Sequence, residues 1–278
     1  PNFTGEVDGA WVKNLVDQAW VDDVVSEFGQ DSSFVQARVH ARFPRTTANQ
    51  VVPIDWIEQA LDPDADLDGP VRLGVDVAAN GGDEFAIARV DGMHARVIHT
   101  STNNNNAVEV AGTILEAIQR AETTHAERGI PVPVRVKIDS IGVGWGVTSL
   151  LQEWGAEGRH RSQIVPVNVG ERAQEHAKFS NQRAEMWWNA RTLLQPDPQG
   201  EQEITLNIDT RTVNQLAAPT YKANSSGRLQ IESKDEMKRR GVHSPDRAEA
   251  VLLSLFDPGR RPFDIVAPLS LPQDSGWI

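Results

Sequence analysis

The chain has 278 residues, of which 39% are hydrophobic, and its formal net charge at pH 7 is −12. It contains no cysteine, which excludes disulfides and cysteine-based metal or nucleophile chemistry. The negative charge argues against a protein that coats nucleic acid through bulk charge. No signal peptide and no apolar run of membrane-spanning length is found. We therefore expect an intracellular protein that is not secreted and has no membrane partner.

Residues 1–65 are expected to form a helical connector. Three helices are predicted there, over residues 20–28, 32–43 and 54–61. The segment is too rich in tryptophan and phenylalanine for a free linker, so it is expected to pack on something. An acidic stretch bounded by prolines, residues 62–70, then marks a domain boundary, and its spacing does not fit a calcium-binding loop.

The next stretch predicts a strand over residues 71–77, followed by a hairpin. Apolar residues alternate along it and place Asp76 on the opposite face. A second run from Phe85 ends at Asp91-Gly92, a sequence typical of a tight turn, and a third run returns. An acid within a strand is costly if it is buried without a partner. Asp76 therefore either faces solvent or is held rigidly for a metal.

The chain then alternates between helix and strand. A helix is predicted over residues 107–126, and a strand over 134–138 ends at Asp139, before three glycines at 142, 144 and 146. A further helix and a strand over 164–167 follow. This order indicates an α/β or α+β sheet domain over residues 66–258, and the proline-rich residues 259–278 are expected to form an extended tail.

Basic residues in the second half are candidates for phosphate contacts. A helix predicted over residues 179–194 carries Arg183 within its apolar stripe, where it either forms an internal ion pair or reaches across a groove to phosphate. After a short helix and a hairpin comes a basic cluster: Lys234, Lys238, Arg239 and Arg240. The cluster is either a solvated face or a DNA contact.

The last predicted helix is apolar almost all round and is therefore buried. Ser244 is expected to cap it, with Asp246 in its first turn and Glu249 one turn later. Two strand acids and a helix-start acid converge if this helix packs over the sheet, and their repulsion is offset by a divalent cation. Oxygen ligands favour Mg²⁺ or Mn²⁺, and two such ions support phosphodiester hydrolysis. Asp83 is a further candidate ligand, or an ordinary turn acid.

The order of these motifs resembles the nuclease domain of tailed-phage terminase large subunits. The resemblance covers residues 70–257 and rests on Gly-Val-Asp-Val-Ala at 74–78 with Gly-Asp at 82–83, and on the stretches at 138–144, 179–188, 231–235 and 244–250. It implies an RNase H-like mixed sheet flanked by helices, with Asp76, Asp139 and Asp246 as metal-binding acids. The family often has Asp where this chain has Glu249, which leaves the role of Glu249 open.

The resemblance also implies a biological role. That role is metal-dependent cutting of concatemeric double-stranded viral DNA during packaging in the host cell cytoplasm, with a portal protein and a small terminase subunit as partners. The ATPase half is missing, because no phosphate-binding loop occurs in the sequence. Two alternatives stay open: a recombination or junction-resolving nuclease of the same fold, and a non-catalytic packaging adaptor that binds through its N-terminal segment.

Overall fold

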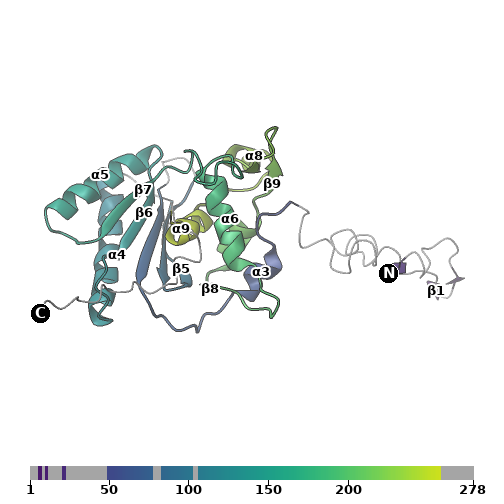
Figure 1. Ribbon diagram of the computed structural model, residues 1–278, viewed down its shortest axis with the longest axis horizontal. Coiled ribbons are helices and arrows are strands. Elements are labelled where there is room, and N and C mark those ends of the chain that lie inside the picture. The colour runs from purple at the N-terminus through teal and green to yellow at the C-terminus, as the bar shows by residue number, and fades with distance from the viewer. Residues whose placement is uncertain are drawn as a thin grey trace, which may run out of the picture.

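The computed structural model describes residues 6–7, 10–11, 21–22, 49–77, 83–102 and 106–257 (Figure 1). Its strands are β1 (Glu6–Val7), β2 (Ala10–Trp11), β3 (Val71–Asp76), β4 (Phe85–Asp91), β5 (His94–Ser101), β6 (Arg135–Asp139), β7 (Gln163–Val167), β8 (Thr205–Asn207), β9 (Tyr221–Ala223) and β10 (Leu229–Ile231). Its helices are α3 (Ile54–Gln59), α4 (Ala107–Glu127), α5 (Val143–Ala156), α6 (Gln182–Leu194), α7 (Thr210–Ala217), α8 (Lys234–Arg239) and α9 (Asp246–Leu255). None of the described helices has the length and apolar composition that a membrane crossing requires.

A six-stranded mixed sheet forms the centre of the fold, in the order β7-β6-β3-β4-β5-β8. The meander β3-β4-β5 is antiparallel, whereas β6 pairs parallel with β3, and β7 pairs parallel with β6. This architecture confirms the predicted mixed α/β sheet. Because β3 and β6 are adjacent and parallel, their carboxyl ends lie at the same edge of the sheet.

Helices cover both faces of this sheet. Figure 1 shows α4 and α5 on one side and α9, with α6 beyond it, on the other. Along β3 the residues Val71, Leu73 and Val75 pack into the core shared with α4 and α5. The alternate residues of β3 face α9, whose apolar side chains belong to a second core with α6 and α7. The alternation that predicted β3 therefore separates two buried faces rather than a buried and a solvated one.

Helix α9 lies directly against β3 at Gly74. A Cβ atom on Gly74 would overlap the carbonyl oxygen of Ala250 and the amide nitrogen of Ser254, both in the backbone of α9. Glycine is required here because no other residue lets the two backbones approach so closely. The crossing fixes the position of α9 along β3, and it sets the first turn of α9 over the strand's carboxyl end.

The turn after β4 lies one residue later than the sequence indicated. Asp91 pairs with His94, so the two turn residues are Gly92, with φ +58°, and Met93. Asp91 is fully buried and forms ion pairs with Arg89, Arg96 and Arg128. Asp91 can therefore be buried at the end of β4, because three cations compensate its charge.

Three elements in the second half differ from the prediction. Helix α6 begins at Gln182 rather than at residue 179, because the side chain of Asn181 caps it by accepting a hydrogen bond from the amide of Ala184. Phe179 instead bridges to Leu229 in β10. Strand β8 and helix α8 were not predicted, because they are only three and six residues long.

The N-terminal part of the chain is described only in pieces. The predicted helix over 54–61 is confirmed as α3, but β1 and β2 form a short antiparallel pair where a helical segment was expected. The predicted helices over residues 20–28 and 32–43 lie almost wholly outside the described residues, as does the tail, 259–278. The three-part division of the chain stays a prediction.

Candidate metal centre at the sheet edge

Asp76 and Asp139 end two adjacent parallel strands. Val75 of β3 pairs with Ile138 of β6, so the acid that follows each of them emerges at the same edge of the sheet. Asp76 is the last residue of its strand rather than a mid-strand residue, and it is only 4% exposed. This burial excludes the interpretation that Asp76 faces solvent.

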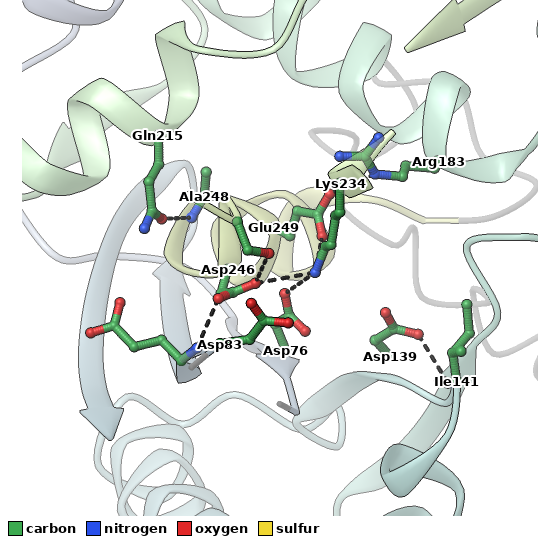
Figure 2. A network of polar contacts seen from close by, with 12 residues as sticks. Asp76, Asp83, Asp139, Ile141, Arg183, Gln215, Lys234, Asp246, Ala248 and Glu249 are labelled. Carbon is green, nitrogen blue, oxygen red and sulfur yellow. Dashed lines mark hydrogen bonds and ion pairs between the residues drawn. The ribbon is translucent and has the colours of Figure 1, made fainter. Parts of the chain in front are cut away.

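The first turn of α9 brings two more acids to this edge. Asp246 and Glu249 are both buried, and Figure 2 shows them beside Asp76. Asp246 accepts a hydrogen bond from the amide of Glu84 at 2.8 Å and another from the Ser244 hydroxyl. Ser244 therefore positions an acid. The prediction that Ser244 caps the helix is wrong, because Pro245 is the N-cap residue and the helix start has no side-chain cap from it.

Gln215, rather than Ser244, accepts hydrogen bonds from backbone amides in the first turn of α9. Its side-chain oxygen accepts hydrogen bonds from the amide of Arg247 at 2.9 Å and from that of Ala248 at 3.2 Å. Figure 2 shows the contact with Ala248. Arg247 also forms an ion pair at 2.8 Å with Glu84, whose amide contacts Asp246. Sequence reasoning missed Gln215 and Glu84, because both act on residues more than 30 positions away along the chain.

Lys234 lies at the centre of the acids. Its Nζ atom is 3.0 Å from Oε2 of Glu249, 3.1 Å from Oδ1 of Asp246 and 3.4 Å from Oδ2 of Asp76. A capping box at Ser233 fixes the start of α8 and with it the position of Lys234. Figure 2 shows the ammonium group pointing into the acids, with Asp139 facing the same opening but set apart from these contacts.

Glu249 is matched by a second cation. Arg183 donates from Nε to Oε1 of Glu249 at 2.7 Å and from Nη1 to the carbonyl of Glu232 at 2.6 Å. The indole of Trp187 adds a hydrogen bond to the same carboxylate at 3.3 Å. The internal ion pair considered for Arg183 is therefore formed, and its contact with phosphate stays a prediction.

The remaining members of the basic cluster point in different directions. Lys238 forms an ion pair with Asp83 at 3.3 Å, and both side chains are substantially exposed. Arg240 pairs with Glu232 at 2.6 Å, while Arg239 lies exposed on the surface. The structure brings Lys234 alone of this cluster into the acids, and DNA contacts by the cluster stay a prediction, as does metal binding by Asp83.

The acids differ in how well their charge is compensated. Burial, reinforced by Glu249, Asp246 and Asp139 and opposed by Lys234, raises the pKa of Asp76 well above its ordinary value. Burial also raises the pKa of Asp139. Although burial disfavours its charge too, Arg183 and Lys234 lower the pKa of Glu249 to about 2. The ionised form of Glu249 is therefore stabilised by its surroundings, whereas the fold disfavours the ionised forms of Asp76 and Asp139.

The donor set fits a hard divalent cation. Four carboxylates (Asp76, Asp139, Asp246 and Glu249) face two cations (Lys234 and Arg183), so the ionised cluster carries a net charge of −2. Oxygen donors with surplus negative charge are what Mg²⁺ and Mn²⁺ prefer. As the side chains stand, no three acids or histidines among the described residues are grouped closely enough to hold a metal. A cation would have to take the place of the Lys234 ammonium.

Comparison with known proteins reveals the fold of this chain. No protein-family model and no curated protein matches it. The nuclease domain of the large terminase subunit gp2 of bacterial virus Sf6 superposes with a TM-score of 0.58 at 20% identity, covering 75% of this chain and 99% of that one. A point variant of that domain, solved with manganese and β-thujaplicinol, gives 0.57 at 19% identity over the same shares. The chain therefore has the RNase H-like fold of a phage large terminase nuclease domain, a mixed sheet flanked by helices.

Proposed function

We propose that this chain is a metal-dependent endonuclease that cuts double-stranded viral DNA during genome packaging. One observation carries the proposal: Asp76, Asp139 and Asp246, from three separate elements, lie at one edge of the sheet. The fold agrees with it, and the similar Sf6 domain has been solved with manganese. Concatemeric substrate, a portal protein, a small terminase subunit and a site of action in the host cytoplasm belong to the same proposal.

The chain's own residues supply a rigid, negatively charged seat for the reaction. Asp76, Asp139 and Asp246 would together bind two ions, either Mg²⁺ or Mn²⁺. When bound, the ions would activate a water and stabilise the leaving oxygen of the phosphodiester. Glu84 and Ser244 hold Asp246 by hydrogen bonds, and Arg183 keeps Glu249 ionised beside the seat. Among the described residues, Nη2 of Arg183 has no hydrogen-bond partner although it is buried, so Arg183 keeps one unused donor beside the acids.

A plasmid assay tests this function. We expect the protein with Mn²⁺ or Mg²⁺ to convert supercoiled plasmid to nicked and linear forms, and a chelator to stop the conversion. Folded protein that leaves the plasmid intact with every divalent cation would contradict the proposal and would favour the adaptor. A strong preference for a four-way junction over linear duplex would instead favour the junction-resolving alternative.

The position of Lys234 gives a further prediction. Lys234→Ala removes an ammonium group that lies within 3.4 Å of three carboxylates. A metal then no longer has to displace this group, so we expect Mn²⁺ to bind at least about tenfold more tightly. A tenfold gain is about 1.4 kcal/mol, which is less than the several kcal/mol by which unit charges at such distances interact in a partly solvated site. Without metal the variant should melt at a lower temperature than wild type, because the acids lose a counter-ion. Calorimetric titration and thermal melts measure both effects.

Arg239→Ala is the matched control. Arg239 lies on the same helix and is exposed on the surface, so its removal should change neither Mn²⁺ affinity nor the melting temperature by a measurable amount. Weaker Mn²⁺ binding in Lys234→Ala would show that the ammonium supports the metal rather than competing with it.

A further inference from the structure

An apolar patch lies next to Asp139 and is not explained by the acid cluster. It consists of Ile141, Val143 and Trp145, whose exposed fractions are 51%, 39% and 68%. Seven large apolar side chains are exposed in the described part of the chain, and three of them fall within these five consecutive residues. Singly exposed apolar residues are ordinary, but a group of this kind marks an interaction surface.

Glycines separate the three apolar residues along the chain. The residues between and after them, Gly142, Gly144 and Gly146, are all glycine, so no side chain other than the three apolar ones occurs between Ile141 and Gly146. A Cβ on Gly146 would meet nothing within 4 Å. Together with the exposure of Trp145, this leaves the start of α5 uncovered by other described parts of the chain.

The backbone ties this patch firmly to the acid. The amide of Ile141 donates a hydrogen bond to the Asp139 carboxylate at 3.1 Å, as Figure 2 shows. Gly142 takes φ +63°, and a Cβ on Gly144 would overlap the carbonyl oxygen of Asp139. The loop is therefore packed onto the backbone of Asp139, which places the patch within a few residues of this acid.

We propose that Trp145, with Ile141 and Val143 beside it, contacts the base and sugar edges of duplex DNA next to the phosphate that is cut. The inference rests on the proposed nuclease function and adds a substrate contact to it. Apolar side chains that meet DNA press into the minor groove and partly unstack a base step, and an indole also stacks on a base. The first turn of α5, which presents Trp145, contains no acid that would repel phosphate.

Kinetics of duplex cleavage test this contact. Because loss of one aromatic–base contact typically weakens binding by about tenfold or more, we expect Trp145→Ala to raise KM about tenfold in Mn²⁺, with a smaller change in kcat. The melting temperature and the Mn²⁺ affinity should match wild type, because the side chain is exposed and binds no metal. The dependence of KM on salt should keep its slope, since no phosphate contact is lost.

Leu67→Ala is the control variant. Leu67 is 40% exposed and lies just before β3, at the end of that strand opposite Asp76, so its removal should leave KM unchanged. An unchanged KM in Trp145→Ala, an equal rise in Leu67→Ala, or a parallel loss of Mn²⁺ affinity would overturn the DNA contact while wild-type cleavage upholds the nuclease. Wild-type protein that cuts no DNA would overturn the proposed function itself and this contact with it.

Discussion

Asp76→Asn should abolish DNA cleavage while leaving the protein at least as stable as wild type. Substitution of a residue that only orients a metal ligand typically lowers metal affinity or activity by about 10–100-fold. Loss of a ligand itself should therefore slow cleavage by at least about a hundredfold. The substitution keeps the shape of the side chain but removes a buried carboxylate whose contact with Lys234, at 3.4 Å, is the longest of the three. Plasmid cleavage rates and thermal melts in chelator measure the two effects.

The same variant has a distinctive pH dependence. The pKa of Asp76 is higher in the folded chain than in the unfolded chain, so the folded state binds more protons and its stability falls as pH rises from the unfolded value of about 3.9 through the raised pKa. Asp76→Asn should lose this decline. Asp66→Asn, a change at an exposed acid in the linker, should cleave DNA and melt like wild type. Full cleavage by folded Asp76→Asn would refute the assignment.

Gly74→Ala should cause the largest loss of stability. Its Cβ would overlap backbone atoms of α9, and backbone in a buried helix cannot move aside as a flexible side chain does. We expect the free energy of unfolding to fall by about 3 kcal/mol or more, measured by urea denaturation. Protein that still folds must have shifted α9, and Asp246 with it, so Mn²⁺ binding should be lost as well.

Gly112→Ala is the matched substitution. Gly112 lies inside α4, where a Cβ would meet nothing within 4 Å, so alanine should stabilise the protein by about 0.5–1 kcal/mol through its better helix propensity. A wild-type urea midpoint for Gly74→Ala would show that α9 does not depend on this close approach.

The sequence predicted the parts of the site that depend on local pattern. Alternating apolar residues located β3 and β6, and with them the acids at their ends, because strand periodicity extends over five or six residues. The start of α9 was found from Asp246, expected in its first turn, although Ser244 does not cap the helix. The crossing of α9 over Gly74 was not foreseen, although a glycine inside a strand is a known sign of close backbone approach.

Contacts between distant residues could not be predicted in this way. Lys234 lies 158 positions from Asp76, and its choice between a DNA surface and the acid cluster depends on how α8 packs. Arg183 was assigned to an apolar stripe that starts at Phe179, yet Asn181 begins the helix later and Glu249 captures the guanidinium. The strand β8 has only three residues and forms by pairing with β5, so it leaves no periodic signal.

In the proposed function, carboxylates from β3, β6 and α9 form one binding site for divalent cations. Crystals soaked in Mn²⁺ and measured at the manganese absorption edge reveal where the ions bind. We expect anomalous peaks bounded by Asp76, Asp139 and Asp246, with the ammonium of Lys234 moved away from its present position among the acids. Manganese bound only elsewhere on the protein, with Lys234 still between Asp76 and Glu249, would contradict it.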